Sequence, residues 1–245
     1  MVGPYTVFWY ALVTAAATGL GAIPFLFFRD MSRRWLGLSN ALAAGLMGAA
    51  SSTLIYEGIA DSAPRVLLGV VLGLAFIAGT QRLLRARPDA QLGSLRGADA
   101  TRGILIVAIM TLHSVTEGIA VGVSFGGGLA LGVFITIAIA VHNVPEGLAI
   151  SLVLVPRGEP VWRAAAWSVF SSLPQPILAV PAFLFVESFE PFLPVGLGFA
   201  AGAMLWMVFA EMIPEALEDA PRDAVALTVT LSLVAMIAFQ ALLRV

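Results

Sequence analysis

Cysteine is absent from this 245-residue chain. Its absence excludes disulfide bonds, zinc–thiolate sites and a thiol nucleophile. Any metal ion must therefore be held by histidine, carboxylate, amide, hydroxyl or methionine side chains. Lysine is absent too, since all thirteen basic residues are arginine.

Charge is scarce as well: 11% of the residues are charged and 60% are hydrophobic, with a mean hydropathy of +0.97. A soluble domain carries about 25% charged residues, and this chain cannot build the polar surface that water requires. The composition therefore predicts a protein whose solvent is lipid. The formal net charge of −2 offers no basic surface, so we expect no nucleic-acid partner.

Long apolar runs fill almost the whole chain. A membrane-spanning helix needs about 20 largely apolar residues. Short breaks with turn residues separate the runs, and the only longer polar segment covers about 85–102. We predict an all-α integral membrane protein in one transporter domain, 1–245. Its eight expected spans are about 4–28, 36–59, 64–84, 103–124, 129–155, 163–186, 191–217 and 223–243.

The arginines predict the orientation. With eight spans, the connections after the first, third, fifth and seventh share one side of the membrane. Eleven of the thirteen arginines lie on that side: Arg29, Arg33, Arg34, Arg82, Arg85, Arg87, Arg96, Arg102, Arg157, Arg163 and Arg222. Only Arg65 and Arg244 lie on the other side. The positive-inside rule then places both termini outside and the 85–102 loop in the cytoplasm.

The two histidines of the chain lie in nearly the same phrase, each in the middle of a predicted span. One phrase is His113-Ser-Val-Thr-Glu117-Gly and the other is His142-Asn-Val-Pro-Glu146-Gly. The i, i+4 spacing puts each histidine and its glutamate on one helix face. If the two helices pack together, two imidazoles and two carboxylates converge, a set that suits Zn, Fe, Mn, Co or Ni better than Ca or Mg.

Other interpretations of these motifs stay open at this point. The four groups can form a metal-free proton relay in a proton-coupled carrier of another solute, or a structural polar cluster, although ionisable groups inside a membrane are functional by default. Gly122-Val-Ser124-Phe-Gly126 matches the G-x-S-x-G pattern of serine hydrolases. That pattern needs a strand-to-helix turn, whereas here it ends a predicted membrane helix, so we expect no enzyme.

These features together resemble the ZIP family of divalent metal transporters. The resemblance extends along essentially the whole chain and is most specific in the phrase from His142 to Gly147. It implies a metal site of His113, Glu117, His142 and Glu146, with Met47 as a soft ligand from the second span. It also implies a neighbouring second site that uses Ser114, Asn143 and Gln175 together with the two glutamates.

The second implied site departs from the usual family pattern, because Ser114 stands where asparagine is common and Gln175 where glutamate is common. The resemblance implies transport towards the cytoplasm by alternating access, with the first, fourth, fifth and sixth spans moving against the others. The expected cargo is Zn²⁺, with Fe²⁺, Mn²⁺, Co²⁺ and Cd²⁺ as alternatives, and no resident cofactor is expected. The expected location is the plasma (inner) membrane. Small residues at four-residue spacing suit internal packing and a homodimer equally well.

Overall fold

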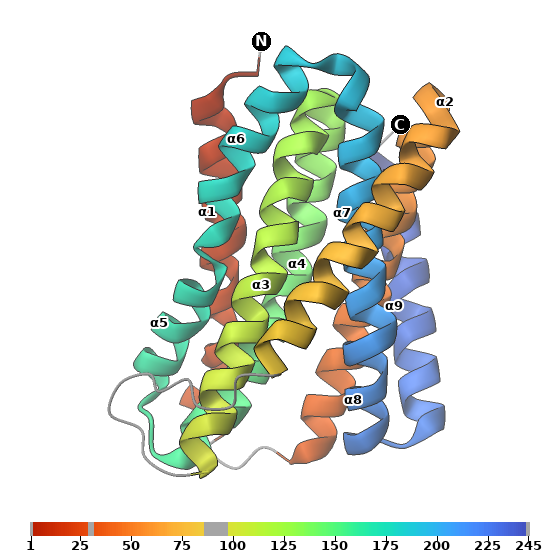
Figure 1. Cartoon of the computed structure of the whole chain (residues 1–245). Coiled ribbons are helices and arrows are strands. Elements are labelled where there is room, and N and C mark those ends of the chain that lie inside the picture. Colours follow the sequence, from red (N-terminus) through yellow and green to blue (C-terminus); the bar gives the residue numbers. More distant parts are fainter. Residues whose placement is uncertain (1, 29–31, 86–97, 244–245) are drawn as a thin grey trace.

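The computed structural model describes residues 2–28, 32–85 and 98–243, and every regular element in these ranges is helical. The helices form one elongated bundle (Figure 1). In chain order the elements are α1 (Pro4–Gly19), η1 (Leu20–Leu26), α2 (Arg33–Arg85), α3 (Ala98–Gly126), α4 (Leu129–Leu154), η2 (Val155–Arg157), α5 (Val161–Ser172), α6 (Pro174–Ser188), η3 (Glu190–Phe192), α7 (Leu193–Met207), η4 (Val208–Met212), α8 (Ile213–Asp219) and α9 (Arg222–Leu243).

Six stretches of the described helices are long and apolar enough to cross a membrane, which confirms an all-helical, multi-pass membrane protein. They are Pro4–Leu26, Arg33–Thr80, Leu129–Arg157, Val161–Ser188, Glu190–Asp219 and Arg222–Leu242. Large apolar side chains on the outside of the bundle are exposed, for example Leu67 on α2 and Leu227 on α9. Such a surface is suited to acyl chains rather than water.

One of the six stretches contains a break. The backbone of α2 leaves the helical region at Ser62, whose φ of −164° and ψ of 101° are extended. An extended residue is the usual start of a new helix, and Pro64 then falls in the first turn, where its missing N–H has no intrahelical partner to lose. The break lies between the two spans predicted at 36–59 and 64–84.

Two other boundaries differ from the sequence prediction. The first span was expected as one helix over 4–28, whereas the structure changes from α1 to the 3₁₀-helix η1 at Leu20. The loop expected over 85–102 is helical from Ala98, where α3 begins. The rest of that loop, residues 86–97, lies outside the described residues.

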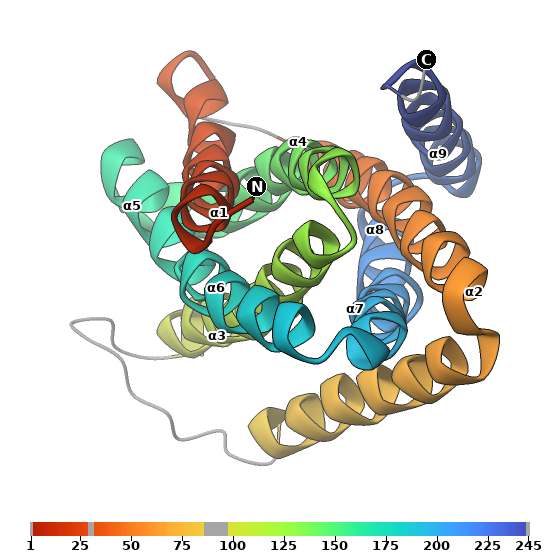
Figure 2. The same ribbon diagram turned by 90° about the horizontal axis from the view of Figure 1, so that it is seen from above.

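Helices α3 and α4 lie in the middle of the bundle (Figure 2). On one side of them are α1, α5 and α6, and on the other are α2, α7 and α8, with α9 outside α2. The turn between α3 and α4 depends on Gly128, whose φ of +117° is unfavourable for a residue with a Cβ. This tight turn brings the middle of α3 beside the middle of α4, where the two histidine phrases lie.

Glycines allow the closest helix contacts. A Cβ on Gly69 or Gly73 of α2 would meet the backbone oxygens of Val195 or Phe199 in α7. A Cβ on Gly122 of α3 would likewise meet the Ala179 oxygen of α6. The small residues at four-residue spacing are therefore used inside one chain.

Candidate metal centre

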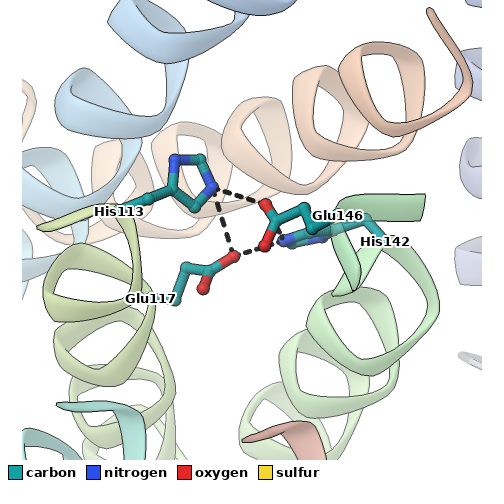
Figure 3. A group of neighbouring side chains, drawn as sticks. All are labelled: His113, Glu117, His142 and Glu146. Atoms are coloured by element: carbon teal, nitrogen blue, oxygen red, sulfur yellow. Dashed lines mark hydrogen bonds and ion pairs between the residues drawn. The ribbon is translucent and has the colours of Figure 1, made fainter. Parts of the chain in front are cut away.

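The central helices bring the two histidine phrases together. His113 and Glu117 lie one turn apart on α3, and His142 and Glu146 lie one turn apart on α4. The tips of all four side chains point toward one another across the contact between these helices (Figure 3). One ligand atom from each residue lies within 4.8 Å of the ligand atoms of the other three.

The nitrogen–oxygen distances define the size of the site. The Nε2 atom of His113 lies 3.3 Å from Oε1 of Glu117 and 2.8 Å from Oε1 of Glu146. The Nε2 atom of His142 lies 2.5 Å from Oε1 of Glu117 and 4.0 Å from Oε1 of Glu146. A tetrahedron around zinc, with bonds of about 2.0–2.2 Å, has edges of about 3.3–3.6 Å. The measured distances fall on both sides of that range, so only small side-chain shifts separate this arrangement from a four-coordinate site.

Burial defines the electrostatics of the site. His113, Glu117 and His142 are at most 1% exposed, and Glu146 is 3% exposed. Two carboxylates without a counter-charge are strongly unfavourable in such a place. A divalent cation balances both charges and uses the imidazoles as neutral ligands.

Glu117 has a second set of neighbours on the side away from the histidines. Its Oε2 atom accepts a hydrogen bond of 2.6 Å from Nε2 of Gln175, which lies in the first turn of α6. Nδ2 of Asn143 donates to Oε1 of Gln175 at 3.2 Å and to the backbone oxygen of Thr14 at 2.8 Å. The Thr14 hydroxyl lies 2.5 Å from the same Gln175 oxygen.

The other residues implied by the resemblance do not all share the same surroundings. Asn143 and Gln175 join the network around Glu117. Ser114 is buried beside His113, and Met47 is buried in the same apolar cluster as Ala120 of α3. Their roles as metal ligands stay predictions.

Thr14 was not among the residues predicted from the sequence for this region. The available signal was a pair of threonines at i, i+4 within an otherwise apolar run, Thr14-Ala-Ala-Ala-Thr18. Both side chains are buried, and Thr18 bonds to Ser172 of α5 at 2.8 Å. Buried hydroxyls in a membrane helix need partners, so this pair predicted polar neighbours on another helix.

The serine of the hydrolase-like pattern, Ser124, forms a hydrogen bond within its own helix. The Ser124 hydroxyl donates to the backbone oxygen of Ala120 at 2.5 Å and is fully buried. No strand precedes it in the described part of the chain, so the strand-to-helix turn of a nucleophile elbow is not formed there.

Comparison with known proteins agrees with the sequence resemblance. The family profile described as ZIP Zinc transporter matches residues 90–241. An Arabidopsis thaliana protein whose name marks it as an inferred zinc transporter is 47% identical over 97% of this chain. The chain spans 39% of that relative's length.

Two bacterial relatives are matched over more of their own length. Zinc transporter GufA of Myxococcus xanthus is 34% identical over 84% of this chain and 86% of its own. Zinc transporter ZIPB of Bordetella bronchiseptica is 35% identical over 82% of this chain and 69% of its own. These relatives are named as transporters rather than enzymes, as expected from the sequence, and the chain belongs to the ZIP family of zinc transporters.

Proposed function

We propose that this chain carries divalent transition-metal ions of the zinc type across the membrane, towards the cytoplasm. The observation that carries the proposal is the convergence of two imidazoles and two carboxylates in the middle of a membrane bundle (Figure 3). The names of the relatives favour zinc as cargo. Fe²⁺, Mn²⁺, Co²⁺ and Cd²⁺ are alternative cargoes, because nitrogen–oxygen sites bind many first-row metals and their neighbours.

The proposed site holds one metal ion between His113, Glu117, His142 and Glu146. Two glutamates balance one dication, whereas two dications in adjacent positions bring four positive charges. At 4 Å and an effective dielectric of ~20, one missing unit charge beside a dication corresponds to about 8 kcal/mol as an upper figure. Gln175 supplies an uncharged amide at the second position, so we propose that this position is weakly occupied.

Eight spans with both termini outside are the topology that we propose, in the plasma (inner) membrane. The break at Ser62 divides α2 into two parts that each exceed the length of about 20 residues needed to cross, and α3 has 29 residues. The start of α1 and the end of α9 lie at the same end of the bundle, as an even number of crossings requires (Figure 1).

The topology is testable because the chain has no cysteine. Ser188→Cys, at the connection between α6 and α7, should react with an impermeant thiol reagent in intact cells. Pro221→Cys, at the connection between α8 and α9, should react only after the membrane is opened. Both residues are exposed. The α6–α7 and α8–α9 connections lie at opposite ends of the bundle (Figure 1). The reverse labelling pattern would overturn the orientation and with it the direction of transport.

Alternating access between two groups of helices is the mechanism that we propose. One group contains α1, α3, α4, α5 and α6, and the other contains α2, α7, α8 and α9. Close glycine contacts to another helix's backbone support this division, since they lie within a group. Examples are Gly122 against α6, Gly69 against α7 and Gly45 of α2 against α9. At Gly196 of α7 the neighbour is instead a side chain, Val123 of the other group.

A homodimer is a further part of the proposal. The glycine pairs already serve contacts inside one chain, so we place the dimer contact on exposed apolar side chains such as Leu227 and Leu231 of α9. Such a contact can form without disturbing the central helices.

Uptake of radioactive zinc into vesicles that contain the purified chain tests the central proposal. We expect uptake that saturates with zinc and falls when unlabelled competing metals are added. Uptake equal to that of empty vesicles, from a correctly folded preparation, would contradict a transport function. A proton-coupled carrier of another solute would then become the better hypothesis.

A further inference from the structure

The two oxygens of Glu117 have different neighbours. Oε1 lies near Nε2 of both histidines, at 2.5 Å from His142 and 3.3 Å from His113. Oε2 accepts a hydrogen bond from the Gln175 amide at 2.6 Å. Only Oε1 is therefore directed at the centre of the candidate metal site.

The direction of the Gln175 amide follows from a backbone carbonyl. The oxygen of Thr14 can only accept, so the NH₂ group of Asn143 must face it at 2.8 Å. The same nitrogen donates to Oε1 of Gln175. Because that oxygen faces Asn143 and the Thr14 hydroxyl, the NH₂ group of Gln175 is left to face Glu117. Every hydrogen bond in this series, from Thr14 on α1 to Glu117 at the metal site, thus pairs a donor with an acceptor.

This network is sealed from solvent. Thr14, Asn143 and Gln175 are each 0% exposed, so bulk water does not compete for their hydrogen bonds. Close packing holds Gln175 in place, since a Cβ on Gly118, next to Glu117, would lie 2.7 Å from the Gln175 backbone oxygen. Rotating the amide by half a turn would place its oxygen against the Glu117 carboxylate and its NH₂ group against the NH₂ group of Asn143. One orientation of Gln175 is thus strongly preferred.

We infer that Gln175 is a positioning residue that keeps Glu117 a one-oxygen ligand and so favours a four-coordinate metal such as zinc over a six-coordinate one such as manganese. The inference rests on the proposed function. The nitrogen that Gln175 turns toward Glu117 carries no free lone pair, so this atom does not bind metal. With Oε2 engaged, Glu117 supplies one ligand atom, and one ligand atom from each of the four residues makes the four ligands that zinc prefers. Manganese prefers six, mostly oxygen ligands.

Releasing Oε2 should weaken this preference. Gln175→Met has a similar length but no polar hydrogen, so both oxygens of Glu117 become available to the metal. Partners that orient ligands typically contribute about 10–100-fold to metal affinity. We expect zinc to bind about tenfold more weakly in this variant. Manganese should lose less affinity, because it readily takes a second carboxylate oxygen as a ligand. The dissociation constants of the two metals therefore become more similar.

A matched pair of threonine variants separates positioning from packing. Thr14→Val removes a hydroxyl that reaches Glu117 only through Gln175. Thr18→Val makes the same change one turn along α1, at a hydroxyl that bonds to Ser172 instead. We expect Thr14→Val to bring the dissociation constants of zinc and manganese about threefold closer to each other. This effect is smaller than the roughly 10–100-fold effect of a residue that bonds directly to a metal ligand. Thr18→Val and Thr14→Ser should keep the ratio of the unmodified chain.

The experiment is titration of the purified full chain with zinc alone and with manganese alone, by calorimetry. Absence of zinc binding to the unmodified chain would overturn the proposed function itself. If the unmodified chain binds zinc but Gln175→Met and Thr14→Val match Thr18→Val in their ratio, the positioning role is wrong and the function stands. If Gln175→Met does not fold, the comparison of Thr14→Val with Thr18→Val decides in the same way.

Discussion

The α3–α4 contact and the α2–α7 contact are both buried, but they are formed by different kinds of residue. Between α3 and α4 lie four ionisable side chains whose ligand atoms converge within 4.8 Å. Between α2 and α7 lie glycines that face backbone, with Gly69 against Val195 and Gly198 against Val66. The first contact holds the candidate metal ligands, whereas the second holds two helices close together. Substitutions should therefore separate loss of transport from loss of fold.

The largest expected effect is on transport, at the α3–α4 contact. Glu146→Ala leaves three ligands and one carboxylate around a dication, and removes the partner that lies 2.8 Å from His113. We expect zinc uptake to fall at least about tenfold, which corresponds to about 1.4 kcal/mol. Uptake is measured per folded protein, with melting temperature recorded beside it.

Glu187→Ala is the matched control for that variant, since Glu187 is exposed at the end of α6. Its uptake should equal that of the unmodified chain. Alanine variants at His113, Glu117 and His142 should behave like Glu146→Ala. If all four variants take up zinc as well as the unmodified chain does, the cluster is structural. The α3–α4 contact would then differ from the α2–α7 contact only in its residue types.

The next effect is on stability, at the α2–α7 contact. Gly69→Ala puts a methyl group against the Val195 backbone, and overpacking of this kind costs about 1–3 kcal/mol. Gly79→Ala, on the same helix, meets no atom within 4 Å. We expect a lower melting temperature for the first variant and an equal or higher one for the second, measured in detergent.

Transport by the folded fraction of Gly69→Ala should retain its apparent affinity for zinc, because the metal ligands are on other helices. A weakened affinity with unchanged stability would mean that the α2–α7 contact takes part in binding. The α2–α7 contact would then serve metal binding as well as helix packing.

The smallest expected effect is at Ser124 on α3, outside the ligand cluster. Its hydroxyl bonds only within its helix among the described contacts, so Ser124→Ala should change uptake by less than about twofold. Uptake assays beside the unmodified chain check this. A complete loss of function in a folded variant would revive the hydrolase interpretation.

Much of this architecture was predictable from local patterns. Hydropathy was sufficient for the membrane class, and the i, i+4 spacing of His113 with Glu117 and of His142 with Glu146 was sufficient for the candidate ligands. The turn at Gly128 that brings the two phrases together is short, so nearest neighbours in sequence are also neighbours in space.

Non-local features were harder to predict. The role of Thr14 depends on α1 packing against α4 and α6, which no pattern within α1 specifies. The π-helical turn η4 at Val208–Met212 also lacks a periodic signal, since one extra residue in a turn does not alter the hydropathy of the run. The direction of the Gln175 amide depends on the Thr14 carbonyl, 161 positions away in the chain.

Anomalous diffraction at the zinc edge, from crystals of the full chain grown with zinc, would locate the bound metal directly. We expect one strong peak between Nε2 of His113, Nε2 of His142 and Oε1 of Glu117 and Glu146, and a weak peak or none beside Gln175. Two peaks of comparable height would refute the single-metal site. No peak at the histidines, with zinc bound elsewhere, would contradict the claim that these four residues carry the cargo.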